Sequence, residues 1–539
     1  MFKRGIQALI VFAVFALLTV AATWPQAQQL ATRTTPHQDV FFNMWRLRWF
    51  AHALATSPAH LFEANIFYPE STTLAFSDAM IVEGLVGAPL LWAGMRPLLV
   101  HNLLLFGAIA ACGAAMFALA RYLTGSRGAG IIAGIVFAYA PYRFEHIMHM
   151  ELQWVMWAPL AFLSLHRTLD TGRWRYGLAT GALVALQMLS SIYYGIFLAT
   201  LLGVGAVLLI ARDRDVALRR ALVPLAAGAI LAAVVCGLYA RPYLAVRDRV
   251  GERSTEEVAS FSARASNYLV ATPTNWFYGR ALASHGRPER RLFPGTIPVV
   301  LALIGLLLRV PSRRSIVYLL LLVAAFETSL GFHGYSYTFL YDYVPAYRGL
   351  RAAARLGVFV LMFLAVLAAY GYAALAEARS VRVRAVIVGL LSLGLLAEYR
   401  VELEFSPYAN TAPPIYRFLA RHPRGVVAEF PIPSPDALPG YEPDYAYMSS
   451  FHWFPLVNGY SGMYPRSYLA RLERLRHFPD ATSLRQLRFD RVRYVVVHVR
   501  GYSPAEYLAV RAGMLRSGTF VELGSYFDAD APAVLYEMR

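Results

Sequence analysis

Charged residues are scarce in this chain: only 15% of its 539 residues are Asp, Glu, Lys or Arg, whereas 58% are hydrophobic. Soluble domains carry about 25% charged residues, so a chain this apolar has too little polar surface to enclose a core. Lysine is almost absent, Lys3 being the only one, and the formal net charge of +17 therefore comes from arginine. This composition excludes an intrinsically disordered protein and indicates a membrane protein with many spanning segments.

Cysteine is equally scarce. The chain has two cysteines, Cys112 and Cys236, and each lies within an apolar run. A disulfide framework or a thiolate metal site requires more cysteines at short, regular spacings. The sequence therefore predicts neither.

Apolar runs make up most of the first 399 residues, and we interpret them as about 11 transmembrane helices. Several runs are shorter than the roughly 20 residues that a bilayer core requires, so we expect their helices to extend into the flanking segments. The first run follows Lys3 and Arg4 without a clear cleavage site, which predicts an uncleaved first span. The runs cover residues 6–24, 97–120, 129–141, 152–165, 176–190, 192–211, 221–240, 295–308, 315–331, 356–376 and 384–398.

The segments between the runs alternate in chemistry. One set is short and rich in arginine, and the other is longer, aromatic and mixed in charge. The arginine-rich set consists of residues 121–127, 167–175, 212–220, 309–314 and 379–384. The positive-inside rule places this set in the cytoplasm, which predicts a cytoplasmic N-terminus and a C-terminus on the outer side. Most of the +17 charge is then a topology signal, and we expect no nucleic-acid partner.

The outer side carries two larger regions. The first outer loop, 25–96, contains the short apolar segment Met80–Trp92, which we interpret as an interfacial or re-entrant helix. After residue 399 the composition changes to short β-branched runs separated by a helix signal at 504–516. These runs, at 426–430, 494–498, 520–523 and 533–536, predict a small α/β domain over residues 400–539. The predicted fold class is an α-helical polytopic membrane protein with outer-face interfacial helices and this C-terminal domain.

A candidate catalytic carboxylate lies early in the first outer loop. Pro36 suits the start of a helix, and Asp39 then falls in its first turn, where the helix dipole favours a carboxylate. Asp39, Asn43 and Arg46 follow at i, i+4 and i+7, so they share one polar stripe on an amphipathic helix at the membrane surface. An ordinary N-terminal helix charge is the alternative interpretation.

The second outer segment, Pro141–Glu151, packs five ionisable groups between two spans. Glu145 and His149 are four residues apart, so on a helix they present one face to a divalent ion. Polar residues of the membrane interface are the alternative.

Three arginines lie on the outer side, against the positive-inside trend. Arg348, Arg351 and Arg355 precede a span at i, i+3 and i+7, which predicts one shared helical face. Three cations at headgroup depth fit a phosphate or pyrophosphate. Ordinary anionic headgroups are the alternative.

These features together resemble the glycosyltransferase C superfamily, which includes protein mannosyltransferases and lipid A aminoarabinose transferases. Several strings look more closely like those of a largely uncharacterised set of bacterial multi-spanning proteins of that type. The strings are His37–Trp45, Ala64–Pro69, Pro141–Phe144, Leu189–Tyr194 and Val457–Gly462. The resemblance implies a chain in the bacterial cytoplasmic (inner) membrane, whose reaction takes place on the outer face.

The resemblance also implies roles for the candidate residues. Such enzymes take a sugar from a polyprenyl-phosphate donor, and the acidic residue of the first loop, here Asp39, acts as a base or metal ligand. The second motif corresponds loosely to Glu145, with His149 nearby. Family members often have two adjacent acidic residues, whereas this chain has Gln38 before Asp39. The cofactor is therefore left open, with a divalent metal ion bound by Asp39, Glu145 and His149 as the candidate.

We expect from this a membrane glycosyltransferase of the cell envelope. Asp39 is the predicted base, Asn43 and the three outer arginines bind substrate, and the acceptor is an envelope glycan, lipid or protein. The partners are the lipid-linked donor, this acceptor and membrane lipids. A lipid or polysaccharide transporter (flippase) is an alternative, but it predicts charges inside the spans, where only Glu327 and Glu398 lie, near outer ends. A non-catalytic scaffold for envelope assembly is the third interpretation.

Overall fold

The computed structural model describes residues 2–539 except 212–216, 284–286, 309–311, 410 and 529–530. The chain divides into two compact units, each built from segments that are separate in sequence. The first, which we call the helical unit, consists of Met1–Leu30, Asn102–Tyr239 and Glu252–Phe405. The second, the mixed unit, consists of Ala31–His101, Ala240–Gly251 and Ser406–Arg539. The mixed unit thus unites most of the predicted first outer loop with the predicted C-terminal domain.

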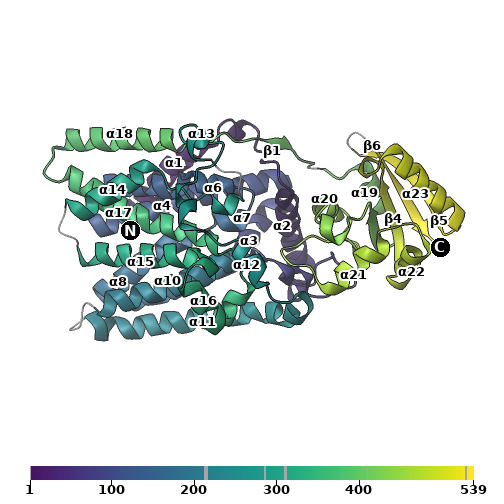
Figure 1. The fold of residues 1–539 in the computed structure, drawn as a ribbon, viewed down its shortest axis with the longest axis horizontal. Helices are drawn as coiled ribbons and strands as arrows, with labels where there is room; N and C mark the ends of the chain where they lie inside the picture. Colours follow the sequence, from purple (N-terminus) through teal and green to yellow (C-terminus); the bar gives the residue numbers. More distant parts are fainter. Residues whose placement is uncertain (1, 212–216, 284–286, 309–311, 410, 529–530) are drawn as a thin grey trace. The chain divides into compact units, whose positions relative to one another are not determined.

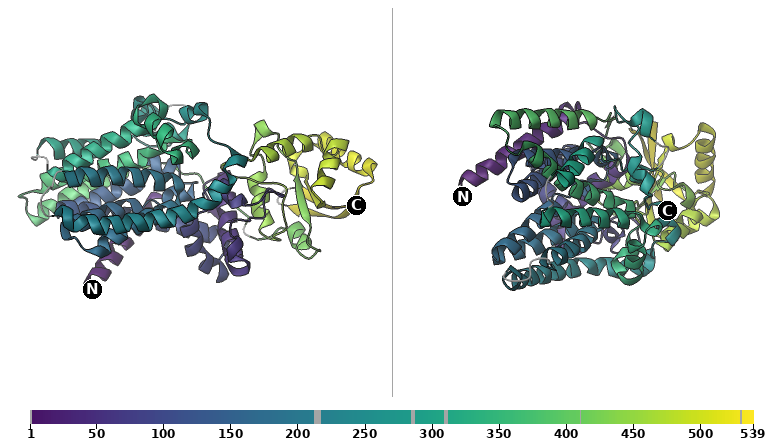
Figure 2. Two further views of the ribbon diagram at one scale, coloured as in Figure 1. Left: turned by 90° about the horizontal axis from the view of Figure 1, so that it is seen from below. Right: turned by 60° about the vertical axis from the view of Figure 1, so that its left-hand side comes forward.

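Each of the eleven predicted apolar runs corresponds to a helix, and most of these helices run in roughly the same direction (Figure 1), as two further views show (Figure 2). The helices are α1 (Phe2–Ala22), α4 (Pro97–Thr124), α5 (Arg127–Tyr139), α8 (Trp157–Thr171), α9 (Trp174–Ser190), α10 (Ile192–Ala211), α11 (Ala217–Val250), α14 (Thr296–Leu307), α15 (Arg313–Ser329), α17 (Gly357–Ala376) and α18 (Val381–Glu398).

Within the described residues, five helical segments are long and apolar enough to cross a membrane. They are Gly5–Ala22, Pro97–Thr124, Ile192–Ala211, Arg220–Val250 and Ala353–Ala376. The count of about 11 spans therefore stays a prediction. The arginine-rich segments 212–220 and 309–314 lie partly outside the described residues, since 212–216 and 309–311 are not described.

Helix α17 forms the centre of the helical unit, and 89% of its most apolar stretch is buried. It packs against α14 at a point where both helices carry glycine. A Cβ atom at Gly371 would overlap the carbonyl of Leu301, and Gly305 faces the backbone of Gly371. Small residues let two helices approach closely, which increases the dispersion contacts between them. These contacts matter in a membrane, because the hydrophobic effect does not favour contact with another helix over contact with lipid.

Short helices fill the loops at one end of these long helices. Between α5 and α8 lie α6 (Pro141–Glu145) and α7 (Met150–Gln153). The loop 252–295 contains α12 (Thr255–Ser260), η4 (Ala265–Leu269), α13 (Gly279–Leu282) and η5 (Pro288–Arg290). The loop before α17 contains η6 (Gly331–His333), α16 (Ser336–Tyr343), η7 (Pro345–Gly349) and η8 (Ala353–Leu356). A further turn, η1 (Gln26–Gln28), follows α1.

The mixed unit begins with β1 (Arg33–Thr34), which pairs with β2 (Ser406–Pro407), and continues into α2 (Gln38–Thr56). After η2 (Pro58–His60) and η3 (Thr73–Phe76) comes α3 (Ile81–Trp92), which confirms a helix in the short apolar segment. The placement of α2 at the membrane surface stays a prediction. Phe42, Trp45 and Trp49 are all buried, because α2 packs against α3 and α20 (Glu442–Ser449).

The predicted α/β elements of the C-terminal segment are confirmed. A sheet contains β3 (Val426–Phe430), β4 (Val492–His498), β5 (Phe520–Asp528) and β6 (Ala531–Met538) in the order β3-β4-β6-β5, with β3 and β4 parallel. Helix α23 (Pro504–Ser517) lies along the sheet (Figure 1), and its Ser503 and Glu506 form a capping box. The remaining elements are α19 (Pro414–Leu419), η9 (Pro435–Ala437), α21 (Arg466–Leu475), α22 (Ala481–Phe489) and η10 (Val499–Gly501).

The two faces of this sheet differ in chemistry, because side chains alternate along a strand. On one face, Val495, Val497 and Phe430 join an apolar core with Met514 of α23. The opposite face carries Glu429 of β3 and His498 of β4, both buried. Two ionisable residues at the carboxyl ends of parallel strands are unusual in a buried sheet.

Candidate functional site

Asp39 lies in the first turn of α2, as the sequence predicts. Nδ1 of His37, the N-cap residue, accepts a hydrogen bond from the Asp39 amide at 3.1 Å. The hydroxyl of Tyr460 donates a hydrogen bond to Oδ1 of Asp39. The side chain of Asp39 is 14% exposed. Asp39 is therefore a carboxylate that is fixed from two sides and still reaches the surface.

Asn43 and Arg46 follow Asp39 along α2, but both are buried. The guanidinium of Arg46 donates to Oδ1 of Asn43 and, at 2.7 Å, to the carbonyl of Asp78. A buried cation is expensive unless such acceptors surround it. Asn43 thus holds a buried arginine, and its role in substrate binding stays a prediction.

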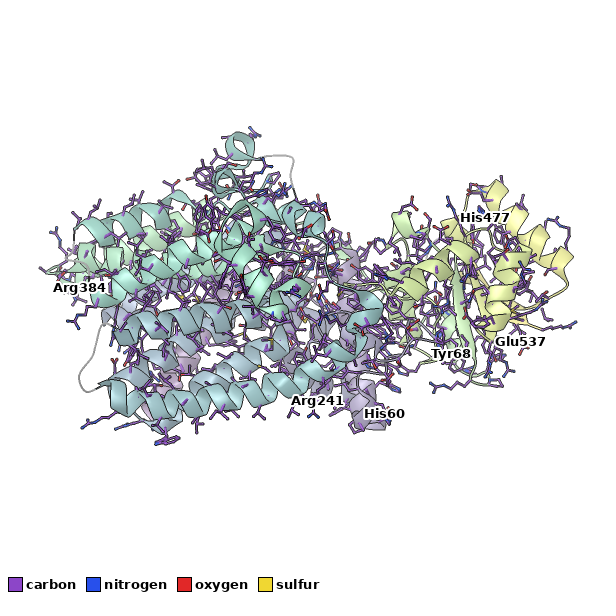
Figure 3. The ribbon with its side chains drawn as sticks, turned by 60° about the horizontal axis from the view of Figure 1, so that its bottom comes forward. His60, Tyr68, Arg241, Arg384, His477 and Glu537 are labelled. Carbon is purple, nitrogen blue, oxygen red and sulfur yellow. The ribbon has the colours of Figure 1, made fainter. Side chains whose placement is uncertain are left out.

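Three of the strings that carry the resemblance meet in the mixed unit. The amide of Tyr68 donates to the carbonyl of Leu456 at 2.8 Å, and that of Phe67 to the carbonyl of Asn458 at 3.0 Å. The ring of Tyr68 (Figure 3) packs against the apolar core of the sheet. Asn65 accepts from Nε1 of Trp45 at 3.2 Å, which ties this ladder to α2. The strings therefore serve one structural purpose, which is to join α2 to the C-terminal segment.

A buried carboxylate holds the loop that carries Tyr460. Glu442 accepts hydrogen bonds from Nδ2 of Asn458 at 3.0 Å, from the amide of Gly459 at 2.6 Å and from the hydroxyl of Tyr468 at 2.8 Å. Burial raises the pKa of Glu442 to about 7, although these donors work in the opposite direction. Sequence analysis missed Glu442, since nothing in its string marks it as buried.

Glu429 and His498 form a second buried pair. Nε2 of His498 lies 2.7 Å from Oε2 of Glu429, and the hydroxyl of Tyr416 donates to the same oxygen at 2.6 Å. Asn458 connects this pair to the loop, because its Oδ1 accepts from the Glu429 amide at 2.7 Å. A glutamate and a histidine inside β-branched runs are the sequence signal by which this pair can be found.

In the helical unit, the segment Arg348–Arg355 does not form the predicted helical face. η7 ends at Gly349 and η8 begins at Ala353, so the three arginines do not share one continuous helix. The prediction was wrong because backbone groups that would bond to one another within a helix bond to other segments instead. The Arg348 carbonyl accepts from the Arg253 amide at 3.3 Å, and the Ala354 amide donates to the Phe261 carbonyl at 3.3 Å.

The three arginines differ in their surroundings. Arg348 donates to the carbonyls of Tyr341 and Asp342 at the end of α16. Nη1 of Arg351 lies 3.7 Å from Oε1 of Glu257. Arg355 is 6% exposed, and its Nη2 lies 3.7 Å from Oε1 of Glu289. Only Arg355 is a buried cation whose nearest carboxylate lies beyond hydrogen-bond distance.

Tyr193, from the string Leu189–Tyr194, lies between two of these arginines. Its ring centroid lies 4.9 Å from the guanidinium carbon of Arg355, and its hydroxyl accepts from the Arg351 amide at 2.8 Å. A cation over an aromatic face is stabilised by the quadrupole of the ring. The structure thus brings this string and the arginine segment together.

Unsatisfied polar groups surround Arg355. His146 is buried, and neither of its ring nitrogens is hydrogen-bonded within the described residues. Burial lowers the pKa of His146 to about 3, which keeps its ring neutral. Nε of Arg355 likewise has no partner in this part of the chain. These groups retain the capacity to bind a polar ligand.

Glu145 and His149 do not lie on one helical face, which corrects that expectation. α6 ends at Glu145 and α7 begins at Met150. The helix is interrupted because the side-chain amide of Gln153 donates hydrogen bonds to the carbonyls of Arg143 and His146. Both oxygens of Glu145 accept from Nη1 of Arg291, at 3.1 and 2.9 Å.

A metal site therefore stays a prediction. Across the described residues there is no group of three or more His, Cys, Asp or Glu arranged to hold a metal ion. The ion pair with Arg291 also neutralises the charge that Glu145 would offer to a cation. The residues thus do not fit a metal in this arrangement, and the mechanism proposed below takes no step through one.

The fold is similar to that of a solved oligosaccharyltransferase. The chain is similar to the archaeal oligosaccharyltransferase AglB from Archaeoglobus fulgidus, solved with an inhibitory peptide and a dolichol-phosphate, with a TM-score of 0.50 at 14% identity, over 99% of this chain and 74% of that one. ArnT from Cupriavidus metallidurans, solved with undecaprenyl phosphate, is similar at a TM-score of 0.45 and 13% identity, over 98% and 97%. No protein-family model and no curated protein matches the sequence.

Proposed function

We propose that this chain, which has the fold of the glycosyltransferase C superfamily, moves a sugar from a polyprenyl-phosphate donor to an envelope acceptor. The proposed place is the outer face of the bacterial cytoplasmic membrane, with the sugar and the acceptor unspecified. The observation that carries the proposal is the placement of Asp39, a partly exposed carboxylate fixed at the start of a helix by Tyr460.

Asp39 is the proposed base. An acceptor hydroxyl attacks the sugar more readily when its proton is removed during the attack, and a carboxylate within hydrogen-bond reach accepts that proton. The proton moves from the hydroxyl to Asp39, the bond from the acceptor oxygen to the sugar forms, and the bond from the sugar to the phosphate breaks. The lipid phosphate leaves with the electron pair of that bond.

Arg351 and Arg355 are proposed to stabilise the phosphate as its charge develops. Arg355 supports this role best, because it is buried, 3.7 Å from its nearest carboxylate, and has an Nε without a partner within the described residues. Arg348 also belongs to the proposed set, but its guanidinium already donates to two backbone carbonyls. Asn43 is also proposed to contribute to substrate binding. It accepts a hydrogen bond from Arg46 of the same helix, and this contact helps to shape α2.

Complementation of a strain that lacks the gene tests this function. Mass spectrometry of the envelope glycans compares the deletion strain with strains that express wild type, Asp39→Asn or Asp444→Asn. Asp444 is the control because it is a carboxylate of the same unit that lies 3.8 Å from Arg500. We expect one sugar to be missing in the deletion strain and restored by wild type and by Asp444→Asn.

Asp39→Asn should restore that sugar at least about 100-fold more slowly, the usual contribution of a general base. Full restoration by Asp39→Asn would remove Asp39 from the mechanism. Envelope glycans that do not change on deletion of the gene would contradict the glycosyltransferase function itself.

A further inference from the structure

The candidate base, Asp39, accepts a hydrogen bond from Tyr460, which lies 421 positions away in sequence. Tyr460 belongs to the string Val457–Gly462, which follows the strand-like ladder with residues 65–68. Its hydroxyl donates to Oδ1 of Asp39, and its ring meets the ring of Phe42 edge-on, with centroids 5.1 Å apart. The position of Tyr460 therefore depends on contacts with α2 on two sides.

The loop before Tyr460 is rigidly held. Asn458 makes two hydrogen bonds with the backbone of Glu429, at 2.7 and 2.9 Å, as a neighbouring strand would. The Gly459 amide donates to Glu442, and a Cβ atom at Gly459 would come within 2.5 Å of the Phe67 ring. Only glycine fits between the ring and the carboxylate, so the loop has little freedom to carry Tyr460 elsewhere.

His37 does not replace Tyr460 as a donor to the carboxylate. Its Nδ1 lies 3.6 Å from Oδ2 of Asp39, beyond hydrogen-bond distance. The same Nδ1 accepts the Asp39 amide at 3.1 Å, and a nitrogen that accepts an N–H bond carries no proton. His37 thus orients the backbone of Asp39, whereas the hydroxyl of Tyr460 orients its carboxylate.

We infer that Tyr460 is a positioning residue for Asp39, and that the C-terminal segment of the chain is part of the catalytic centre through the loop Asn458–Tyr460. The inference rests on the proposed function for the role of Asp39 as base. A base must hold its accepting oxygen in line with the attacking hydroxyl, and a charge-assisted hydrogen bond to the other oxygen restricts rotation of the carboxylate. The contacts of Glu442 and Asn458 hold the loop against the sheet and thereby fix the position from which Tyr460 donates this bond.

Carboxylate labelling tests the positioning without any substrate. Purified full-length protein in lipid nanodiscs is treated with a water-soluble carbodiimide and glycine ethyl ester, and mass spectrometry measures the rate at which Asp39 is modified. Tyr460→Phe removes only the hydroxyl. Tyr447→Phe is the matched control, because its hydroxyl donates to the carbonyl of Ala409 at 2.9 Å and its ring lies near Phe41.

We expect Tyr460→Phe to increase the labelling rate of Asp39 several-fold, while Tyr447→Phe leaves it at the wild-type rate and both variants keep the wild-type melting temperature within a few degrees. An unchanged labelling rate in Tyr460→Phe would overturn the inference. This outcome does not depend on whether the chain transfers sugar, so the inference and the proposed function can fail separately.

The activity measurement then uses the complemented deletion strain. After induction, the rate at which the missing envelope sugar returns is measured per amount of protein. We expect about a 10-fold to 100-fold slower return for Tyr460→Phe, the usual loss when a hydrogen bond that orients a charged group is removed. A rate for Tyr460→Phe equal to that of Tyr447→Phe would show that the hydroxyl has no part in positioning.

Discussion

The ring of Tyr193 lies 4.9 Å from the guanidinium carbon of Arg355, while the hydroxyl of the same residue accepts from the Arg351 amide at 2.8 Å. One side chain thus supports a buried cation and fixes the backbone before it. Burial alone would raise the pKa of nearby Glu289, but the interactions with His146 and Arg355 lower that pKa below its usual value. The result is a polar cluster with one carboxylate and one well-supported arginine.

Arg355→Gln should weaken binding of a short-chain polyprenyl phosphate by about 10-fold to 100-fold, since charge-assisted bonds to phosphate are among the stronger ones. Native mass spectrometry of the protein in nanodiscs measures this binding. Arg493→Gln is the control, because that guanidinium pairs with Glu537 at 2.9 Å and lies outside the proposed binding set.

A second variant separates lost binding from lost stability. Arg355→Gln leaves Glu289 buried without a cation, and an unpaired buried charge destabilises a fold. The double variant Arg355→Gln/Glu289→Gln removes both charges and should fold while still binding weakly. Wild-type affinity in the double variant would contradict the role of Arg355 in phosphate binding.

Gly459→Ala should destabilise the mixed unit. The added Cβ would lie 2.5 Å from the Phe67 ring, which is buried and cannot retreat, and overpacking of this kind costs about 1–3 kcal/mol. Gly462→Ala, in the same string, would meet the Ser77 hydroxyl at 3.3 Å and should be nearly neutral. Differential scanning fluorimetry compares the two, and equal melting temperatures would show that the loop relaxes freely.

The contribution of Glu442 to the stability of the fold should fall as the pH rises from about 5 to 7. Burial raises the pKa of Glu442 from 4.5 to about 7, so the folded chain binds this proton more tightly than the unfolded chain does. The stabilisation is then fully present below pH 4.5 and is lost as the pH rises through 7. A shift of this size corresponds to about 3 kcal/mol.

Melting temperatures between pH 5 and 8 measure this loss. The melting temperature of wild type should fall relative to that of Glu442→Gln as the pH rises, since an amide does not titrate. Glu473→Gln removes a carboxylate whose side chain is 54% exposed and should keep the wild-type slope. A difference between wild type and Glu442→Gln that does not change with pH would contradict the raised pKa of Glu442.

The predicted topology can be tested by thiol labelling in whole cells. In a background without Cys112 and Cys236, Arg175→Cys and Arg511→Cys introduce thiols at exposed positions. A membrane-impermeant maleimide that crosses only the outer membrane should label Arg511→Cys in intact cells, and Arg175→Cys only after the cytoplasmic membrane is permeabilised. Labelling of both in intact cells would contradict the cytoplasmic assignment of the arginine-rich segments.

Local sequence signals predicted the elements well. The apolar runs correspond to helices, and the β-branched runs around Ala428 and Val496 correspond to strands. Ser503, Pro504 and Glu506 form the predicted helix start. These signals succeed because hydrophobic periodicity and capping act over a few residues, within the range that a sequence pattern covers.

Tertiary contacts account for what the sequence did not predict. The spacing of Arg348, Arg351 and Arg355 indicates a helix, but hydrogen bonds from the loop 253–261 replace the helical ones. The string around Asn458 was visible, yet nothing in it shows that Tyr460 contacts Asp39. Glu442 looks like a surface residue until the fold encloses it.

The ladder between residues 65–68 and 456–458 has a consequence for how the protein is made. The residue that orients Asp39 leaves the ribosome 421 positions after Asp39 itself. All the intervening helices must be inserted before the mixed unit can close, because its segments are separate in the chain. A nascent chain in which Tyr460 has not yet emerged therefore lacks an organised base, so that, under the proposed function, transfer would begin only after that residue is in place.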